Sequence, residues 1–139
     1  MRKAAAVICL GFLAFVYVAP SFADSISCND DSTVSIRNEL LADKKTRDLY
    51  RTTLSGDKSS PLKLATEIAK SKPNYVMCIN RLGAENGDPV SQYNYATRLL
   101  ESDDEATKAR GIFWLKKAAA ADLKIAKSLL SEHQASSTK

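Results

Sequence analysis

Two stretches decide the fold: GDPVSQYNYA at residues 87–96 and WLKKAA at residues 114–119. Shifting the chain against itself by 35 residues places Ile79 on Trp114 and Ser91 on Ala126. A period of this length is typical of paired helices that stack as a solenoid, because one pair cannot bury its apolar side without its neighbours. The other aligned residues are Gly83-Ala84 with Ala118-Ala119, Val90 with Ile125, and Tyr95 with Leu130.

The rest of the chain also has apolar residues at helical spacing, and no run alternates apolar and polar residues long enough to predict a strand. We therefore predict an all-α fold. Ser60-Pro61 and Asp88-Pro89 each offer a capping residue followed by proline at the first helical position. The expected helices lie at 32–54 (one helix or two), from Ser60 to Lys72, from Asn74 to Asn86, from Pro89 through Leu100, from Asp103-Asp104-Glu105 to Ala121, and from Leu123 to His133.

The two quoted stretches together resemble the Sel1-like repeat. That family's pattern is a glycine turn, a helix of the form Ala-Gln-Tyr-Asn-Leu-Gly, and then an aromatic residue followed by a basic pair and two alanines. The resemblance spans roughly Tyr75 to His133 and departs from the pattern at Tyr95, Ala96 and Asp122, the last of which replaces the closing glycine. It implies a short α-solenoid of paired antiparallel helices, akin to tetratricopeptide repeats.

Small and aromatic residues have separate physical roles in such a stack. Small residues allow two helices to approach closely, whereas aromatic rings fill the space between pairs. Added bulk at Ala118 should therefore destabilise the fold, and we expect Trp114 to be a core residue rather than a ligand-stacking one. The residues assigned to the repeat framework are Gly87, Tyr93, Ala96, Gly111, Trp114, Ala118 and Ala119.

The resemblance also implies a function. Proteins similar to Sel1-like repeat proteins chiefly bind other proteins on a concave face built from the first helix of each pair. Gln92, Asn94 and Arg98 are then the exposed polar candidates for partner contact. The alternative interpretation is that these three residues only form a solvated helix face.

The first residues predict export. Arg2 and Lys3 precede 15 uncharged residues from Ala4 to Val18, and small residues favour cleavage after Ala23. The apolar run is shorter than the ~20 residues that a spanning helix needs, so we expect no stable membrane anchor. We divide the chain into a signal peptide (1–23), an N-terminal helical cap (24–59), the Sel1-like repeat region (60–133) and a disordered tail (134–139).

Two cysteines remain after cleavage, Cys28 and Cys78. In a periplasmic or secreted protein a single disulfide is the economical pairing, although two thiols are the alternative. Without Arg2 and Lys3 the chain has 18 basic and 16 acidic residues, interspersed along its length. This balance gives no electrostatic reason to expect binding to nucleic acid.

Catalytic chemistry finds little support in the sequence. The triplet Asp103-Asp104-Glu105 fits a helix start, where carboxylates interact favourably with the helix dipole, better than an acid–base pair. The chain's single histidine, His133, offers the usual base for serine or cysteine chemistry only near the tail. We expect a non-catalytic exported protein-binding module with no metal or cofactor. The alternatives are an immunity or inhibitor protein against an envelope-acting toxin enzyme and, with least support, a small hydrolase or binder of penicillin-type compounds.

Overall fold

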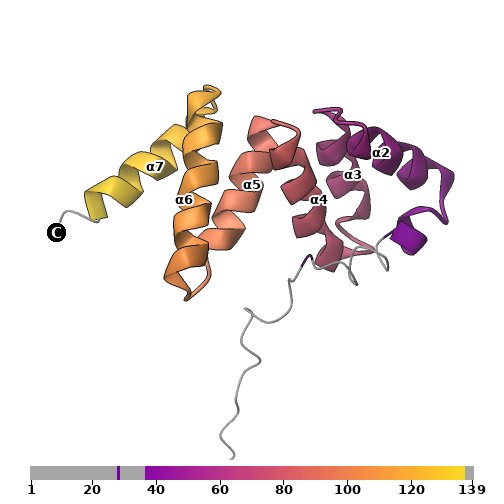
Figure 1. The fold of residues 1–139 in the computed structure, drawn as a ribbon, viewed down its shortest axis with the longest axis horizontal. Helices are drawn as coiled ribbons and strands as arrows, with labels where there is room; N and C mark the ends of the chain where they lie inside the picture. Colours follow the sequence, from indigo (N-terminus) through magenta and orange to yellow (C-terminus); the bar gives the residue numbers. More distant parts are fainter. Residues whose placement is uncertain (1–27, 29–36, 137–139) are drawn as a thin grey trace, which may run out of the picture.

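The computed structural model describes Cys28 and residues 37–136. Most of these residues are helical and none of them lies in a strand, which confirms the predicted all-α class. Figure 1 shows the helices as one row from α2 to α7, in which each helix packs against its neighbours along the chain. The predicted signal peptide lies outside the described residues. The helices are α2 (Lys44–Leu54), α3 (Ser60–Ile68), α4 (Pro73–Glu85), α5 (Pro89–Leu100), α6 (Glu105–Ala120) and α7 (Lys124–Ser136).

Aspartates fix where the helices begin. Asp88 and Asp104 accept hydrogen bonds from the backbone N–H groups of Ser91 and Thr107, both at 2.7 Å, as the sequence predicts. The start of α3 differs from the prediction, because Ser60 is not the cap. The carboxylate of Asp57 instead accepts the backbone N–H of Ser60 at 2.6 Å, and hydrogen bonds from Ser60 and Ser59 lower its pKa to about 2.

One type of helix end recurs three times. Gly56, Gly87 and Asp122 follow α2, α4 and α6 with positive φ angles of 90°, 87° and 68°. At Gly87, for example, the backbone N–H donates to the carbonyl of Ala84, and the next N–H donates to the carbonyl of Gly83. This pair of hydrogen bonds is the Schellman motif. It favours glycine because a residue with a Cβ is strained at positive φ. Asp122 therefore occupies a true glycine position, at the point where the sequence departs from the repeat pattern.

The repeat also extends further toward the N-terminus than the sequence indicates. Shifting α2 and α3 by 31 residues places them on α4 and α5, so α2 lies in the stack in the register of α4. Four residues inserted between α5 and the middle of α6 lengthen the next period to 35, which hides the match in the sequence. The buried equivalents are Thr53, Ser60, Leu64, Ala65 and Ile68 with Ala84, Ser91, Tyr95, Ala96 and Leu99.

The C-terminal boundary differs slightly as well. The prediction ends the last helix at His133 and begins a disordered tail at residue 134, but α7 continues to Ser136. Residues 137–139 lie outside the described part of the chain. The sequence predicts either one helix or two over residues 32–54. In the structure, residues 41–43 separate a short helical segment at 37–40 from α2.

Small residues set the helix spacing in the middle of the row. A Cβ on Gly111 would lie 3.1 Å from the carbonyl oxygen of Ala96 and 3.0 Å from Leu100 Cγ. Ala96 and Ala118 are fully buried. Trp114 is only 8% exposed and meets the ring of Tyr95 edge-on at 6.0 Å, which confirms its core role. Tyr93 packs against the same cluster.

A second apolar cluster occupies the N-terminal half and contains a disulfide. Cys28 and Cys78 are bonded, with their Cα atoms 5.7 Å apart, as the sequence predicts. Cys78 lies in the cluster with Leu40, Tyr50 and Ile79 from three different parts of the chain. The disulfide therefore fastens the segment that precedes α2 to the middle of α4.

Candidate protein-binding surface

Gln92 does not face solvent, contrary to the prediction. Its side chain lies on the side of α5 that packs on α4, where it is 7% exposed. Its Nε2 donates a 3.2 Å hydrogen bond to the carbonyl of Ala84, in the last turn of α4. The side-chain amide donates a hydrogen bond to this buried carbonyl without bringing a charge into the interface, which explains a glutamine at a buried position. Gln92 is therefore a structural residue, not a partner contact.

Asn94 and Arg98 are half-buried and one helical turn apart on α5. Arg98 forms an ion pair with Glu101, which directly follows the helix. The Thr97 hydroxyl donates a 3.0 Å hydrogen bond to the backbone carbonyl of Asn94, within the helix, so this bond does not involve the Asn94 side chain. The two side chains can offer an amide and a guanidinium to a partner, and both are placed by a helix whose other side is buried.

The repeat places other residues at the same positions on neighbouring helices. Lys63 and Glu67 of α3 are the equivalents of Asn94 and Arg98, and Leu129 and His133 are their equivalents on α7. Glu67 is bound to Lys45 of α2 through a 2.6 Å ion pair. We call this set the first-helix surface. Its members share one register but differ in charge and polarity, so it lacks the uniform sign that would favour a polyanion.

An open hollow of about 620 Å³ lies between α2 and the start of α3. Its chemistry is that of surface side chains, including an ion pair of Lys44 with Asp48 at 3.2 Å and a hydrogen bond between the Thr52 and Ser60 hydroxyls at 2.8 Å. His133 lies on α7, at the opposite end of the row (Figure 1). The hollow thus brings two hydroxyls together without an imidazole to activate them. Its lining residues are Asp43, Lys44, Lys45, Asp48, Leu49, Thr52 and Ser60.

The acidic triplet acts as a helix start. Asp104 accepts from both the N–H and the hydroxyl of Thr107, and these bonds lower the pKa of its carboxyl. Glu105 pairs with Lys108 at 2.8 Å. No group of three or more histidine, cysteine or acidic side chains within the described residues is placed to hold a metal ion. Capping therefore accounts for the position of these carboxylates.

Sequence reasoning missed one exposed aromatic residue. Phe113 of α6 is 50% exposed, beside the buried Trp114. The 35-residue offset pairs it with Cys78, which is buried, so a comparison of the two repeat units could have drawn attention to this position. The other large apolar side chains exposed in the described residues are Leu54 and Ile125.

None of the described helices is long and apolar enough to cross a membrane. Comparison of the chain with family models, curated proteins and solved structures finds no match. The helical architecture and the disulfide are therefore established from the structure alone, and function rests on the chemistry of the surfaces described above.

Proposed function

We propose that this protein is a non-catalytic, exported protein-binding module of the bacterial periplasm or envelope, related to the Sel1-like repeat proteins. The observation that carries the proposal is the stack of helix pairs in one register, held by small residues at its contacts. Such a stack presents to a partner one row of side chains, contributed by every second helix. Asn94 and Arg98 are the central candidates in that row.

The repeat positions support the proposed family relationship. Gly87 ends α4 at positive φ, and Gly111, Ala96 and Ala118 lie at close helix contacts. These are the sites at which the family pattern requires small residues. The Cys28–Cys78 bond supports export, because disulfides persist mainly in oxidising compartments outside the cytosol.

Affinity capture from an envelope extract tests the proposal. The wild-type chain should retain a defined partner, and Arg98→Ala should weaken retention while Lys70→Ala, on an exposed stretch after α3, should not. Truncation of a half-buried, ion-paired arginine such as Arg98 should cost about 1 kcal/mol or more of binding free energy only if a partner buries the side chain fully. Capture of no partner from the extract, or equal retention by all three proteins, would argue against this surface.

The same experiment separates two forms of the proposal. An inhibitor or immunity protein should bring down one partner tightly, whereas an assembly factor should recover several envelope components. Export itself is tested by fractionation of cells that express the full chain. A processed protein that begins near Asp24 in the periplasmic fraction is the expected result, and an unprocessed cytosolic protein would contradict it.

A further inference from the structure

Phe113 lies between two cations on the outer side of α6. Arg110 precedes it by three residues and Lys117 follows it by four, so the three side chains share one helix face, with Lys116 alongside. The Phe113 ring packs edge-on against Trp114 at 5.1 Å, and Lys117 Nζ lies 5.3 Å from the Phe113 centroid. A half-exposed ring that is held on one side by the core is a pre-formed contact, since little rotamer freedom remains to be lost. We call these four residues the Phe113 surface.

The equivalent positions on α4 are covered. Shifting by 35 residues, Arg110, Phe113 and Lys117 correspond to Tyr75, Cys78 and Leu82. The hydroxyl of Tyr75 donates to Glu39 at 2.9 Å, and Cys78 is bonded to Cys28. Tyr75 and Leu82 pack against the same apolar cluster. On α4, therefore, chain from before α2 covers this face with apolar groups and a carboxylate.

The Phe113 surface has no such cover among the described residues. Its three cations are exposed, and none of them forms an ion pair within the described part of the chain. Residues 106–121 contain four basic residues and no acidic one. Lys108 is neutralised by Glu105, which leaves the positive charge concentrated around the ring. Electrostatic complementarity therefore favours a negatively charged partner on the Phe113 surface.

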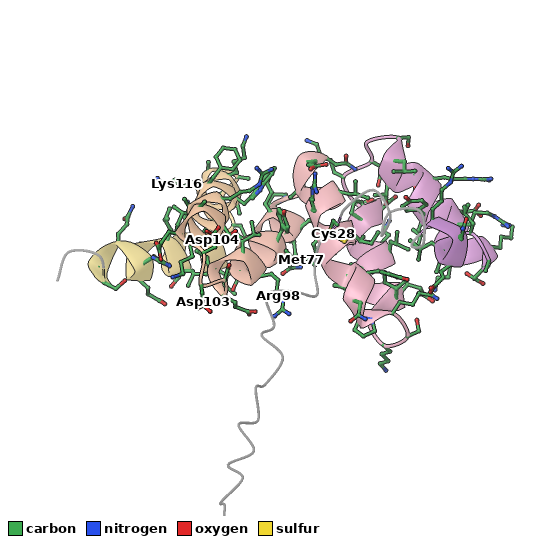
Figure 2. The ribbon with its side chains drawn as sticks, turned by 60° about the horizontal axis from the view of Figure 1, so that its bottom comes forward. Cys28, Met77, Arg98, Asp103, Asp104 and Lys116 are labelled. Carbon is green, nitrogen blue, oxygen red and sulfur yellow. A yellow bond between two sulfur atoms is a disulfide. The ribbon has the colours of Figure 1, made fainter. Side chains whose placement is uncertain are left out.

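We propose that the Phe113 surface binds an acidic segment of another polypeptide, with an apolar side chain on Phe113 and carboxylates at Arg110, Lys116 and Lys117. A polypeptide is favoured over a lipid surface, because one aromatic side chain on an alanine-rich helix buries too little area to hold a membrane. It is favoured over nucleic acid because the rest of the chain has mixed charge. In Figure 2, Lys116 lies at the upper edge of the molecule and Arg98 at the lower edge, so this surface is separate from the first-helix surface.

Fluorescence polarisation with a defined probe tests the proposal. The probe is a short labelled peptide rich in glutamate that carries leucines, and the matched probe has lysine in place of each glutamate. The wild-type protein should bind the acidic probe, more weakly at high salt. Phe113→Ala and the double change Arg110→Glu, Lys117→Glu should each weaken binding about tenfold, the effect expected of a central contact.

Leu54→Ala and Arg51→Glu are matched controls, because they remove an equally exposed apolar side chain and an exposed cation from α2. They should leave binding unchanged, and the helical circular dichroism of every variant should match the wild type. Equal losses in the α2 and α6 variants, or no preference for the acidic probe, would overturn the proposal. Tighter binding to phosphatidylglycerol vesicles or to duplex DNA than to the acidic probe would also overturn it, in favour of a membrane or a nucleic acid. An Arg98→Ala variant that retains full binding would show that this result is independent of the first-helix surface.

Discussion

Three equivalent helix contacts, α2 with α3, α4 with α5 and α6 with α7, use side chains of different size at the same position. In α2–α3 two hydroxyls meet at 2.8 Å beside an open hollow of about 620 Å³. In α4–α5 the approach is so close that a Cβ on Gly83 would lie 2.3 Å from Ser91 Oγ. In α6–α7 both residues are fully buried alanines. The residues concerned are, in chain order, Thr52 with Ser60, Gly83 with Ser91, and Ala118 with Ala126.

This difference shows how the stack is held together in its two halves. Where the pair is glycine with serine or two alanines, the helices interlock through close contact, and dispersion and burial stabilise them. Where the pair is threonine with serine, the contact is a hydrogen bond between two hydroxyls, and the threonine is exposed. In that half the chain adds a covalent link, because Cys28 and Cys78 fasten the segment before α2 to α4.

Breaking the disulfide should have the largest effect. The bond joins residues that are 50 apart in sequence, and the chain-entropy estimate for a loop of this length is about 4 kcal/mol of unfolding free energy, commonly reduced in practice. Urea unfolding of oxidised and reduced wild-type protein should show this loss. Hydrogen exchange should locate it, with protection falling further in α4 than in α6.

The double variant Cys28→Ser, Cys78→Ser provides an independent route to the same state, since it removes the bond without a reductant. Its free energy of unfolding should match that of the reduced wild type within about 1 kcal/mol, the usual scale of a point change. A reduced protein as stable as the oxidised one, or protection lost equally along the row, would mean that the link does not serve the N-terminal half.

Gly83→Ala should destabilise by about 1–3 kcal/mol, the usual cost of overpacking a close contact. The added Cβ would meet Ser91 Cβ at 2.6 Å and Pro61 Cβ at 2.8 Å, which are not flexible side-chain ends. Adding Ser91→Ala reproduces the Ala118–Ala126 pair and removes the 2.3 Å contact with Ser91 Oγ, so it should recover part of the loss, while the contacts with the Cβ of residue 91 and with Pro61 remain. Chemical denaturation of the single and double variants measures both steps.

Gly56→Ala is a useful control, because it adds a Cβ with no atom within 4 Å and tests backbone strain alone. If the double variant is no more stable than Gly83→Ala, side-chain size at this position does not set the helix spacing, and the comparison between pairs fails. A loss confined to the single variant would support it.

Features of the fold that depend on neighbouring residues in the sequence could be predicted, whereas those that depend on contacts between helices could not. Proline, glycine and aspartate mark the helix ends in the sequence. The predicted helix starts at Asp88 and Asp104 are confirmed. The membership of α2 in the stack was hidden because the first period is four residues shorter than the second. Burial of Gln92 was missed because a polar residue on an amphipathic helix is expected outside, and only the neighbouring carbonyl of Ala84 explains it.

The turn after α6 offers a smaller test. Asp122 has φ 68°, whereas glycine occupies the equivalent position after α2 and α4. Asp122→Gly should raise the thermal midpoint by a few degrees, because glycine adopts this conformation without strain. The ion pair with Lys127 is lost, but an exposed pair contributes little. Gly87→Asp, the reverse change at the equivalent turn, should lower the midpoint.

The thermal midpoint should rise in Asp122→Gly and fall in Gly87→Asp. If Asp122→Gly lowers the midpoint, the ion pair with Lys127 outweighs the backbone strain, and the turn after α6 differs in kind from the other two. Differential scanning calorimetry at low and high salt separates the two contributions, since only the ion pair is screened by salt.

The smallest effect should come from acid titration of the cap between α2 and α3. Asp57 has a pKa of about 2 in the folded chain against an ordinary value of 3.8, because Ser60 and Ser59 donate hydrogen bonds to the carboxylate. A lowered pKa means that the folded state binds the proton less readily than the unfolded chain. The stabilisation is therefore fully present above about pH 4 and is lost as the pH falls toward 2.

Asp57→Asn removes this titration and keeps a residue that can cap the helix. Its thermal midpoint should fall less steeply than that of the wild type between about pH 4 and pH 2. The slope will not vanish, because hydrogen bonds from Lys72 and Tyr75 lower the pKa of Glu39, and a hydrogen bond from Lys127 lowers that of Asp122. Parallel curves for the two proteins in this range would show that the Asp57 carboxylate does not hold the start of α3, and the helix would then depend on burial of Leu64 and Ile68 alone.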